Sequence, residues 1–470
     1  MLRTFKHKFV GDRAFYKMVL TVAVPIMIQN GITNFVSLLD NIMVGRVGTE
    51  QMSGVAIVNQ LIFVYYLCIF GGLAGAGIFT AQYFGQKDDE GIRYTFRYKI
   101  WMALILTAGA MLILGIFGKD LIQMYLAGNS DGGDLHAALQ YGQSYLWVMF
   151  LGLPPFMIVQ VYTSTLRECA QTVVPMKAGI AAVFVNLIFN YILIYGKLGF
   201  PALGVVGAAA ATSLSRYAEA AIVILWTHRH PEKNTYIPGI YRSLKLPAHL
   251  AGKYFIKGMP LLINETLWAS GMAVLTQCYS VRGLNAIAGL NIANTINNVF
   301  TVVFIALGDA VAIIVGQLLG AGKMKEARDT DNKIIAFSVF VCFFIAAAMF
   351  IVSPLFPKLY NTTNAARLLA TRFIMAQAVF MPQNAFMHST YFTLRSGGKT
   401  FVTFLFDSVF VWCVSVPIAF FLSRYTSLYV VLILVMVQVG DWIKCVIGFV
   451  LVKKGIWLQN IVQDHKEQSH

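Results

Sequence analysis

The sequence predicts an all-α membrane protein whose twelve transmembrane helices form two six-helix lobes, related by a parallel pseudo-two-fold repeat. Three observations support this fold: long uncharged stretches, an uneven distribution of basic residues, and an internal repeat. Of the 470 residues, 58% are hydrophobic and only 12% are charged, whereas soluble domains carry roughly 25% charged residues. This composition excludes an ordinary soluble protein.

Uncharged apolar stretches define the predicted helices. A helix needs about 20 mostly apolar residues to cross the hydrocarbon core of a bilayer. Such stretches alternate with short charged segments along the whole chain. We predict spans at residues 18–45, 52–84, 100–118, 137–165, 178–196, 204–227, 254–281, 285–318, 334–356, 373–394, 400–423 and 427–452.

Basic residues predict the orientation of these spans. Outside the spans, Lys and Arg are far more numerous in the two termini and the even-numbered loops than in the odd-numbered loops. Basic residues stay on the cytoplasmic side, so we expect a multi-pass protein of the plasma (cytoplasmic) membrane with both termini cytoplasmic. The net charge of +15 then faces anionic lipid, and it does not indicate a nucleic-acid partner.

The two halves of the chain resemble each other. Shifting the first half by 235 residues aligns it with the second without a gap over the first two spans of each half, and a second block recurs at an offset of 228 residues. The matched pairs are Pro25/Pro260, Gly48/Gly283, Gly54/Gly289, Asn59/Asn294, Gln82/Gln317, Gly85/Gly320 and Pro154/Pro382, together with Thr165–Arg167 and Thr393–Arg395.

This repeat predicts the domain organisation. Six spans per copy is an even number, so both copies enter the membrane in the same direction. We expect an N-terminal lobe at 1–227, an inter-lobe cytoplasmic loop at 228–250, and a C-terminal lobe with a short tail at 251–470. Transporters commonly place their site at such a repeat interface, whereas the alternative is a duplicated scaffold that transports nothing.

Asp40 is the first candidate for chemistry, because polar groups inside a bilayer are costly and usually functional. The apolar helix resumes after Asp40. A buried carboxylate is stabilised by taking up a proton or a cation. The alternative is an interfacial Asp40 that pairs with Arg46.

Glu265 is a second candidate carboxylate. Its repeat counterpart is Asn30, whereas Asp40 corresponds to Leu275, so the two acids are not symmetry mates. Ten residues separate them in the repeat frame, which is roughly 15 Å of helix rise. We expect Glu265 nearer the cytoplasm and Asp40 nearer the outside; snorkelling of Glu265 to the interface is the alternative.

Asn186 and Asn190 share one face of a predicted helix because they are four residues apart. Amide oxygens together with one carboxylate suit a hard cation such as sodium, and Thr212 on the next span can add a hydroxyl. We therefore consider sodium at Asp40, Asn186 and Asn190, with a hydrogen-bonded helix pair as the alternative.

Four further residues are candidates for a hinge or a substrate cavity: Pro25, Gln29, Pro260 and Asn264. Proline removes a backbone hydrogen bond and bends a helix, so Pro25 and Pro260 are either hinges or static kinks.

Other charged residues, Asp309, Asp407, Asp441 and Lys444, interrupt later spans. Asp441 and Lys444 are expected to pair, since they lie three residues apart on one helix.

No enzyme is indicated. The chain contains no phosphate-binding loop ending in GK[ST], no HExxH and no GxSxG. We expect no cofactor, and transport would then depend on an ion gradient.

These motifs together resemble the multidrug and toxic compound extrusion (MATE) transporters of bacteria. The resemblance rests on Leu39–Gly48, on Gly199–Thr212 and on the Thr-Leu-Arg elements, and it extends over essentially the whole chain. It implies twelve helices in two lobes, and export of organic cations or other amphipathic compounds by antiport with sodium or protons. Asp40, Asn186 and Asn190 match the cation site of that family's first lobe, and Glu265 matches an acidic position in the second. One branch has an Asp where this chain has Asn384, which favours coupling in the first lobe.

The resulting hypothesis is a monomeric multidrug efflux transporter that exchanges small amphipathic or cationic substrates for sodium or protons. Two alternatives remain. A lipid-linked precursor flippase would require a basic cavity for phosphates, and a non-transporting membrane scaffold would require no buried carboxylates.

Overall fold

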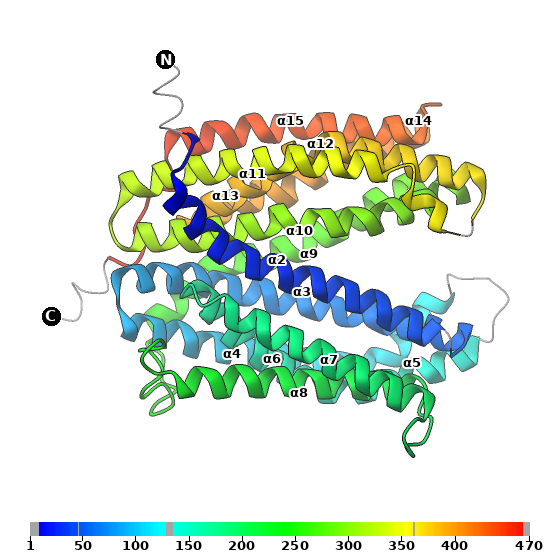
Figure 1. Cartoon of the computed structure of the whole chain (residues 1–470), viewed down its shortest axis with the longest axis horizontal. Coiled ribbons are helices and arrows are strands. Elements are labelled where there is room, and N and C mark those ends of the chain that lie inside the picture. The colour runs from blue at the N-terminus through cyan, green and yellow to red at the C-terminus, as the bar shows by residue number, and fades with distance from the viewer. Residues whose placement is uncertain (1–8, 46, 128–134, 361, 464–470) are drawn as a thin grey trace. The chain divides into compact units, whose positions relative to one another are not determined.

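The computed structural model describes residues 9–45, 47–127, 135–360 and 362–463, and these residues form helices and loops without a β-strand. These described residues contain twelve long helical segments, which confirms the predicted helix number; Figure 1 shows how the helices run. Ten of them are long and apolar enough to cross a membrane. The other two, α9 and α12, fall short because they carry polar and charged residues along their length.

The first six segments end at Arg229. They are α2 (Arg13–Gly45), α3 (Thr49–Gln86), α4 (Asp89–Ala127), α5 (Leu135–Met149) continued through η1 (Phe150–Gly152) into α6 (Leu153–Glu168), α7 (Val173–Tyr195) and α8 (Val205–Arg229).

The second six begin at Ala248. They are α9 (Ala248–Ser280), α10 (Leu284–Gly320), α11 (Met324–Val352), α12 (Asn364–Ser396), a segment built from α13 (Thr400–Phe404), η3 (Leu405–Val409), η4 (Val411–Ser415) and α14 (Val416–Tyr425), and α15 (Val430–Lys454). Between α11 and α12 lies the short 3₁₀ helix η2 (Phe356–Leu359). Several helices exceed the predicted spans, because they continue past the apolar stretch into polar sequence: α4 extends well beyond residues 100–118 on both sides.

The chain divides into two compact units. The N-unit comprises Ile28–Thr80 and Asp89–Phe255, and the C-unit comprises Met1–Met27, Ala81–Asp88 and Ile256–His470. Three helices, α2, α3 and α9, contribute residues to both units. The lobes expected at 1–227 and 251–470 follow the repeat and stay a prediction, whereas the compact units assign the first part of α2 to the C-unit.

In the N-unit, α8 packs against α5, α6 and α7, and α4 packs against α5 and α6 (Figure 1). Small residues at the start of α8 allow close approach. A Cβ on Gly207 would lie 2.5 Å from the carbonyl oxygen of Leu193 on α7. This contact sets the spacing of α7 and α8, which carry three of the candidate residues.

In the C-unit, α12 packs against α10, α11 and α15 (Figure 1). The polar sequence of α12 is compatible with this position because most of its side chains from Phe373 to Ser396 are buried or half-buried in protein. Residues Val19, Ala23 and Ile26 of α2 join the same apolar core.

Repeat-equivalent residues meet within the C-unit. A Cβ on Gly85 would lie 1.9 Å from the carbonyl oxygen of Gln317, and a Cβ on Gly320 would lie 1.9 Å from that of Gln82. Gly85 and Gly320 are one matched pair of the repeat, and Gln82 and Gln317 are another. The contact is therefore reciprocal, as two-fold symmetry requires.

Candidate functional site

The N-unit joins Asp40 of α2 to α7 and α8 through a chain of hydrogen bonds. Asn190 Nδ2 donates to Asp40 Oδ1 over 2.6 Å and to Asn186 Oδ1 over 3.0 Å, and Asn186 Nδ2 donates to Thr212 Oγ1 over 3.3 Å. Asn190 is 1% exposed and Asn186 is 4% exposed. The four residues of this half that the sequence assigned to cation coupling thus lie in one network. Arg46, the alternative partner of Asp40, lies outside the described residues.

The orientation of the side chains in this network shows how well Asp40, Asn186 and Asn190 fit a sodium ion. Asn190 presents its nitrogen to both Asp40 and Asn186, so the three side chains do not direct three oxygens at one point. Asn190 Oδ1 is buried and has no hydrogen-bond partner among the described residues. A half-turn of this amide would place Oδ1 beside Asp40, and the three residues would then offer the oxygen ligands that sodium needs.

Sequence reasoning overlooked two charged residues of α8, one of which acts on Asp40. Arg216 lies one turn after Thr212 on α8 and bonds Glu219 through Nη1 over 2.9 Å. Its guanidinium lies 5.3 Å from the centre of the Phe156 ring, and its charge acts on Asp40. Glu219 is 3% exposed. Two charges inside a predicted span were the available signal.

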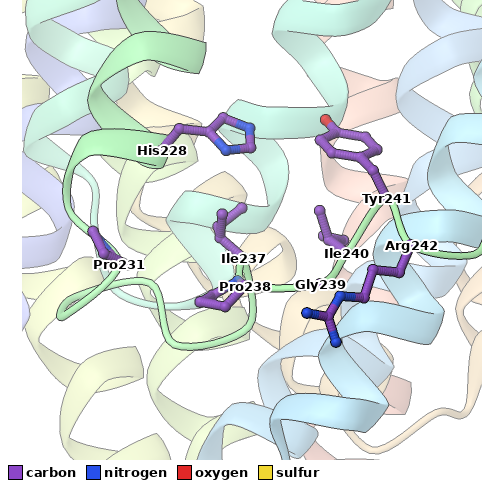
Figure 2. Close-up of a pocket in the computed structure, with 8 residues that line it drawn as sticks. All are labelled: His228, Pro231, Ile237, Pro238, Gly239, Ile240, Tyr241 and Arg242. Atoms are coloured by element: carbon purple, nitrogen blue, oxygen red, sulfur yellow. The ribbon is translucent and has the colours of Figure 1, made fainter.

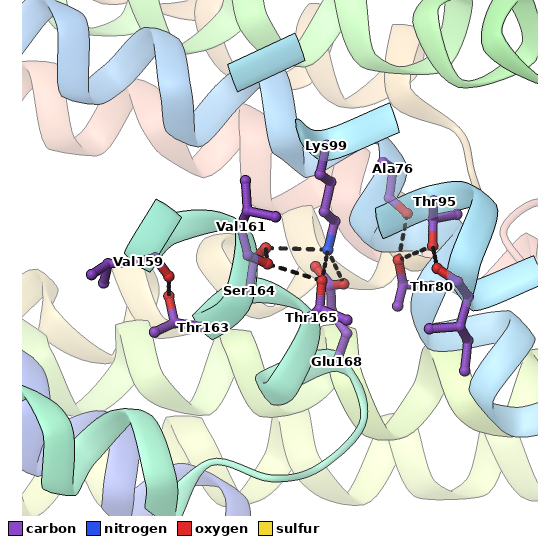
Figure 3. Close-up of polar contacts among 11 residues, drawn as sticks. Ala76, Thr80, Thr95, Lys99, Val159, Val161, Thr163, Ser164, Thr165 and Glu168 are labelled. Atoms are coloured by element: carbon purple, nitrogen blue, oxygen red, sulfur yellow. Dashed lines mark hydrogen bonds and ion pairs between the residues drawn. The ribbon is translucent and has the colours of Figure 1, made fainter. Parts of the chain in front are cut away.

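A buried lysine forms a second polar cluster in the N-unit (Figure 3). Lys99 Nζ donates to Glu168 Oε2 over 2.5 Å and to the hydroxyls of Ser164 and Thr165 over 3.1 Å each. Lys99 is 0% exposed. Sequence reasoning missed it because residue 99 falls just outside the predicted span at 100–118.

The Thr-Leu-Arg elements contact a buried charge in both halves. Thr165 accepts from Lys99, whereas its counterpart Thr393 donates to Asp331 Oδ1 over 2.6 Å. Asp331 is 0% exposed. The two threonines occupy equivalent positions of the repeat, but one contacts a buried positive charge and the other a buried negative charge.

The remaining candidates of the first half lie on α2. Arg167 Nη2 donates to Gln29 Oε1, which links Gln29 to the first Thr-Leu-Arg element. Pro25 is buried inside α2, and Pro260 lies inside α9.

Asn264 belongs to a separate network in the C-unit. Asn264 Nδ2 donates to Asp407 Oδ2 over 3.1 Å and to the hydroxyl of Tyr391 over 3.4 Å, and its Oδ1 accepts from Ser408 Oγ over 2.7 Å. Glu265, the next residue, is half-buried; the charge of Arg395 attracts it and that of Asp407 repels it. The depth of Glu265 relative to Asp40 stays a prediction, since the two belong to different units.

The expected pairing of Asp441 with Lys444 is wrong. Lys444 Nζ donates to Asp407 Oδ1 over 2.7 Å, whereas Asp441 Oδ1 accepts from Ser415 Oγ over 3.1 Å. Helical spacing favoured the local partner, but Asp407 on the neighbouring helical segment approaches the lysine more closely.

The segment between α8 and α9 folds over α4 and, together with the end of α8, lines an open pocket of about 510 Å³ (Figure 2). Arg93 and Arg97 of α4 donate to the carbonyl oxygens of Tyr236 and Ile240. Burial raises the pKa of Tyr236 well above its usual range, so its phenol stays neutral. The pocket is lined by His228, Pro231, Ile237, Pro238, Gly239, Ile240, Tyr241 and Arg242. We assign it no role, because none of the candidate residues lines it.

Comparisons with known proteins agree with this architecture. The family model described as MatE matches residues 25–192 and again residues 260–421. The two matches begin 235 residues apart, at Pro25 and Pro260, so they fall on the two copies of the repeat.

Relatives match over nearly their whole length. A protein from Bacillus subtilis (strain 168) described as "Probable multidrug resistance protein NorM" is 25% identical, covering 97% of both chains. The "Multidrug resistance protein PmpM" of Pseudomonas aeruginosa is 25% identical over 87% of this chain and 84% of that one.

Solved structures share the fold. A transporter of the MOP superfamily from Pyrococcus furiosus has a TM-score of 0.82 at 19% identity, covering 95% of this chain and 96% of that one. A structure described as MATE in the bent conformation has a TM-score of 0.84 at 19% identity, with the same coverage.

Proposed function

The chain belongs to the MatE family, and from this we propose that it is a secondary multidrug efflux transporter. It exports organic cations or other amphipathic compounds in exchange for sodium or protons. The relatives from Bacillus subtilis and Pseudomonas aeruginosa are described as multidrug resistance proteins, which supports this substrate class.

The observation that carries the proposal is the hydrogen-bonded chain from Asp40 through Asn190 and Asn186 to Thr212. A proton or sodium ion on Asp40 neutralises its charge and weakens the bond from Asn190, since hydrogen bonds to an ionised acceptor are the stronger ones. Ion binding thus changes how α2 is held against α7. A ligand shifts a conformational equilibrium only through such a differential interaction.

Either coupling ion has support. A proton can bind Asp40 without rearranging the amides, whereas sodium requires the turn of Asn190 that would direct its unpartnered Oδ1 inward. We propose that Asp40, Asn186, Asn190 and Thr212 form the coupling site and that Glu265 acts as an accessory carboxylate.

We propose that the remaining candidates act as hinges or line the substrate cavity. Pro25 lies two residues before the point at which α2 passes from the C-unit to the N-unit. Because proline removes a backbone hydrogen bond, we propose Pro25 as a hinge and Pro260 as its counterpart in α9. Gln29 and Asn264 are proposed to face the substrate cavity.

The two alternatives have less support. A lipid-linked flippase needs uncompensated positive charge for phosphates, but Arg216 is paired with Glu219 and Lys99 with Glu168. A non-transporting scaffold gives no reason for a half-buried Asp40 that is bonded to an amide inside the bundle.

Transport in proteoliposomes tests the proposal. We expect the purified chain to move ethidium against its gradient when a sodium gradient or a pH gradient is imposed, each applied separately. Asp40→Asn should abolish gradient-driven movement. Asp441→Asn, which removes a carboxylate bonded only to Ser415 among the described residues, serves as the matched control and should retain most of the activity.

Two outcomes would contradict the proposal at different levels. Undiminished coupled transport by Asp40→Asn would rule out Asp40 as the coupling residue. No gradient-driven movement by the wild-type chain, with any organic cation tried, would remove the transporter assignment itself.

A further inference from the structure

We propose that the C-unit contains an organic-cation site at Asp407, which Lys444 occupies as a tethered ammonium, and that transported cations compete with Lys444 for this carboxylate. The inference rests on the proposed function, because it concerns where the exported cation binds. It identifies a substrate-binding carboxylate outside the Asp40 network and outside Glu265.

The carboxylate of Asp407 is positioned without help from Lys444. Asn264 Nδ2 holds Asp407 Oδ2 over 3.1 Å, and Asn264 is itself fixed through Oδ1 by the hydroxyl of Ser408 over 2.7 Å and by the Ser408 backbone N–H over 3.3 Å. Tyr391 lies 3.4 Å from the same amide nitrogen. When the lysine leaves, the second oxygen of Asp407 therefore keeps its place.

The backbone around Asp407 is irregular. The residue lies in the π-helical turn η3 (Leu405–Val409), and a second π-helical turn, η4 (Val411–Ser415), follows after one residue. Such turns are rare and occur frequently at functional sites, because the extra residue redirects side chains. In this segment Asp407 and Ser408 form hydrogen bonds with Asn264. The ring of Phe406 lies beside Lys444 of α15.

The surroundings of Lys444 Nζ are those of an organic-cation site. Besides Asp407 Oδ1 at 2.7 Å, the ammonium lies 5.1 Å from the centre of the Phe406 ring. A carboxylate beside an aromatic face is the combination that recognises organic cations. Thr390 of α12, which lies against Gly448 of α15, has a hydroxyl that is buried without a hydrogen-bond partner among the described residues.

A comparison with Lys99 separates an exchangeable lysine from a fixed one. Lys99 Nζ is held by three oxygen acceptors and is 0% exposed. Lys444 has one oxygen acceptor among the described residues, and the side chain of Asp407 is 19% exposed against 10% for Lys444. The carboxylate is thus the more accessible partner, and only one ion pair must break.

The experiment measures equilibrium binding of ethidium to the full-length chain in detergent, without any gradient, by its fluorescence. If Lys444 competes for Asp407, its removal in Lys444→Met frees the site and should tighten binding by about tenfold. The double variant Asp407→Asn/Lys444→Met should lose that gain and bind no better than wild type. Lys99→Met, which removes the fixed lysine, is the matched control and should leave the affinity unchanged.

Binding by Lys444→Met at or below wild-type affinity, in protein that remains monodisperse, would overturn the proposal. If Lys444→Met does not fold, Lys444→Ala is melted with and without n-butylammonium, with n-butanol as the neutral control. A melting temperature raised only by the ammonium supports the site, and no such rise overturns it.

The result is independent of the coupling experiment. Wild-type protein that transports, combined with an unchanged affinity in Lys444→Met, would remove this inference and leave the proposed function standing. Absence of transport by wild type would remove the proposed function first.

Discussion

The carboxylate of Asp40 accepts a hydrogen bond from the side-chain amide of Asn190, and the same amide donates to Asn186. Each bond in this series makes the orientation of the next side chain specific, so the carboxylate is coupled to α8 through two asparagines of α7. Removing a partner from a buried polar group costs about 1–3 kcal/mol. The free-energy cost of such a substitution should fall mainly on the conformational state in which the wild-type protein forms that hydrogen bond.

This series predicts graded effects on coupling. Asn190→Leu removes the direct donor to Asp40 and should reduce gradient-driven efflux by more than about tenfold, since 1.4 kcal/mol is a factor of ten. Asn186→Leu should be intermediate. Thr212→Val removes only the 3.3 Å contact at the far end and should have the smallest effect. Initial rates in proteoliposomes with equal protein content measure this order, and a reversed order would contradict the network.

At the residue scale, composition located the polar candidates but did not decide their partners. Asp40, Asn186, Asn190 and Thr212 were identified because each is polar within an apolar stretch, and they do meet. Lys444 was assigned to Asp441 by spacing along one helix, but it bonds Asp407. A partner on another helix depends on packing, which spacing does not contain.

At the element scale, close helix packing depends on a few glycines. Gly85 and Gly320 place α3 and α10 in backbone contact, and Gln82 then donates to the Ser396 and Gln459 carbonyl oxygens over 3.0 and 3.2 Å. The Ile461 backbone N–H donates back to Gln82 Oε1 over 2.9 Å. These contacts fix α3, α10 and the chain after α15 to one another.

We therefore expect Gly320→Ala to destabilise the protein. Its Cβ would meet a backbone oxygen at 1.9 Å, and overpacking of this kind typically costs about 1–3 kcal/mol. Thermal unfolding in detergent, monitored by size-exclusion chromatography after heating, measures the effect. Gly109→Ala in α4 is the control, because nothing lies within 4 Å of a Cβ there. Equal melting temperatures for the two variants would show that α3 and α10 have room to separate.

For the whole molecule, the repeat accounts for the positions of the helices, but it does not account for the buried charged residues. The prolines, the glycine contact and the Thr-Leu-Arg elements occur in both halves, and the MatE model matches each half separately. The charged groups differ: Thr165 contacts Lys99, whereas Thr393 contacts Asp331. The repeat therefore accounts for the helices of both halves, whereas the buried charged groups are specific to each half.

The orientation in the membrane is testable on the whole chain. Because basic residues concentrate in the termini and the even-numbered loops, both termini should be cytoplasmic. A C-terminal green fluorescent protein fusion should therefore fluoresce, and a C-terminal alkaline phosphatase fusion should be inactive. Active phosphatase would reverse the assigned orientation.

By itself the sequence determined the helix number, the repeat and the four polar residues of the Asp40 network, because hydrophobic length, fixed offsets and polar residues within apolar stretches are properties of the chain. Only the tertiary structure decided that Lys444 binds Asp407, that Arg216 lies near Asp40, and that Asn190 directs its nitrogen at the carboxylate. These depend on helix rotation and on side-chain orientation. The hydrophobic pattern of a membrane helix constrains both weakly, because lipid and protein neighbours are almost equally apolar.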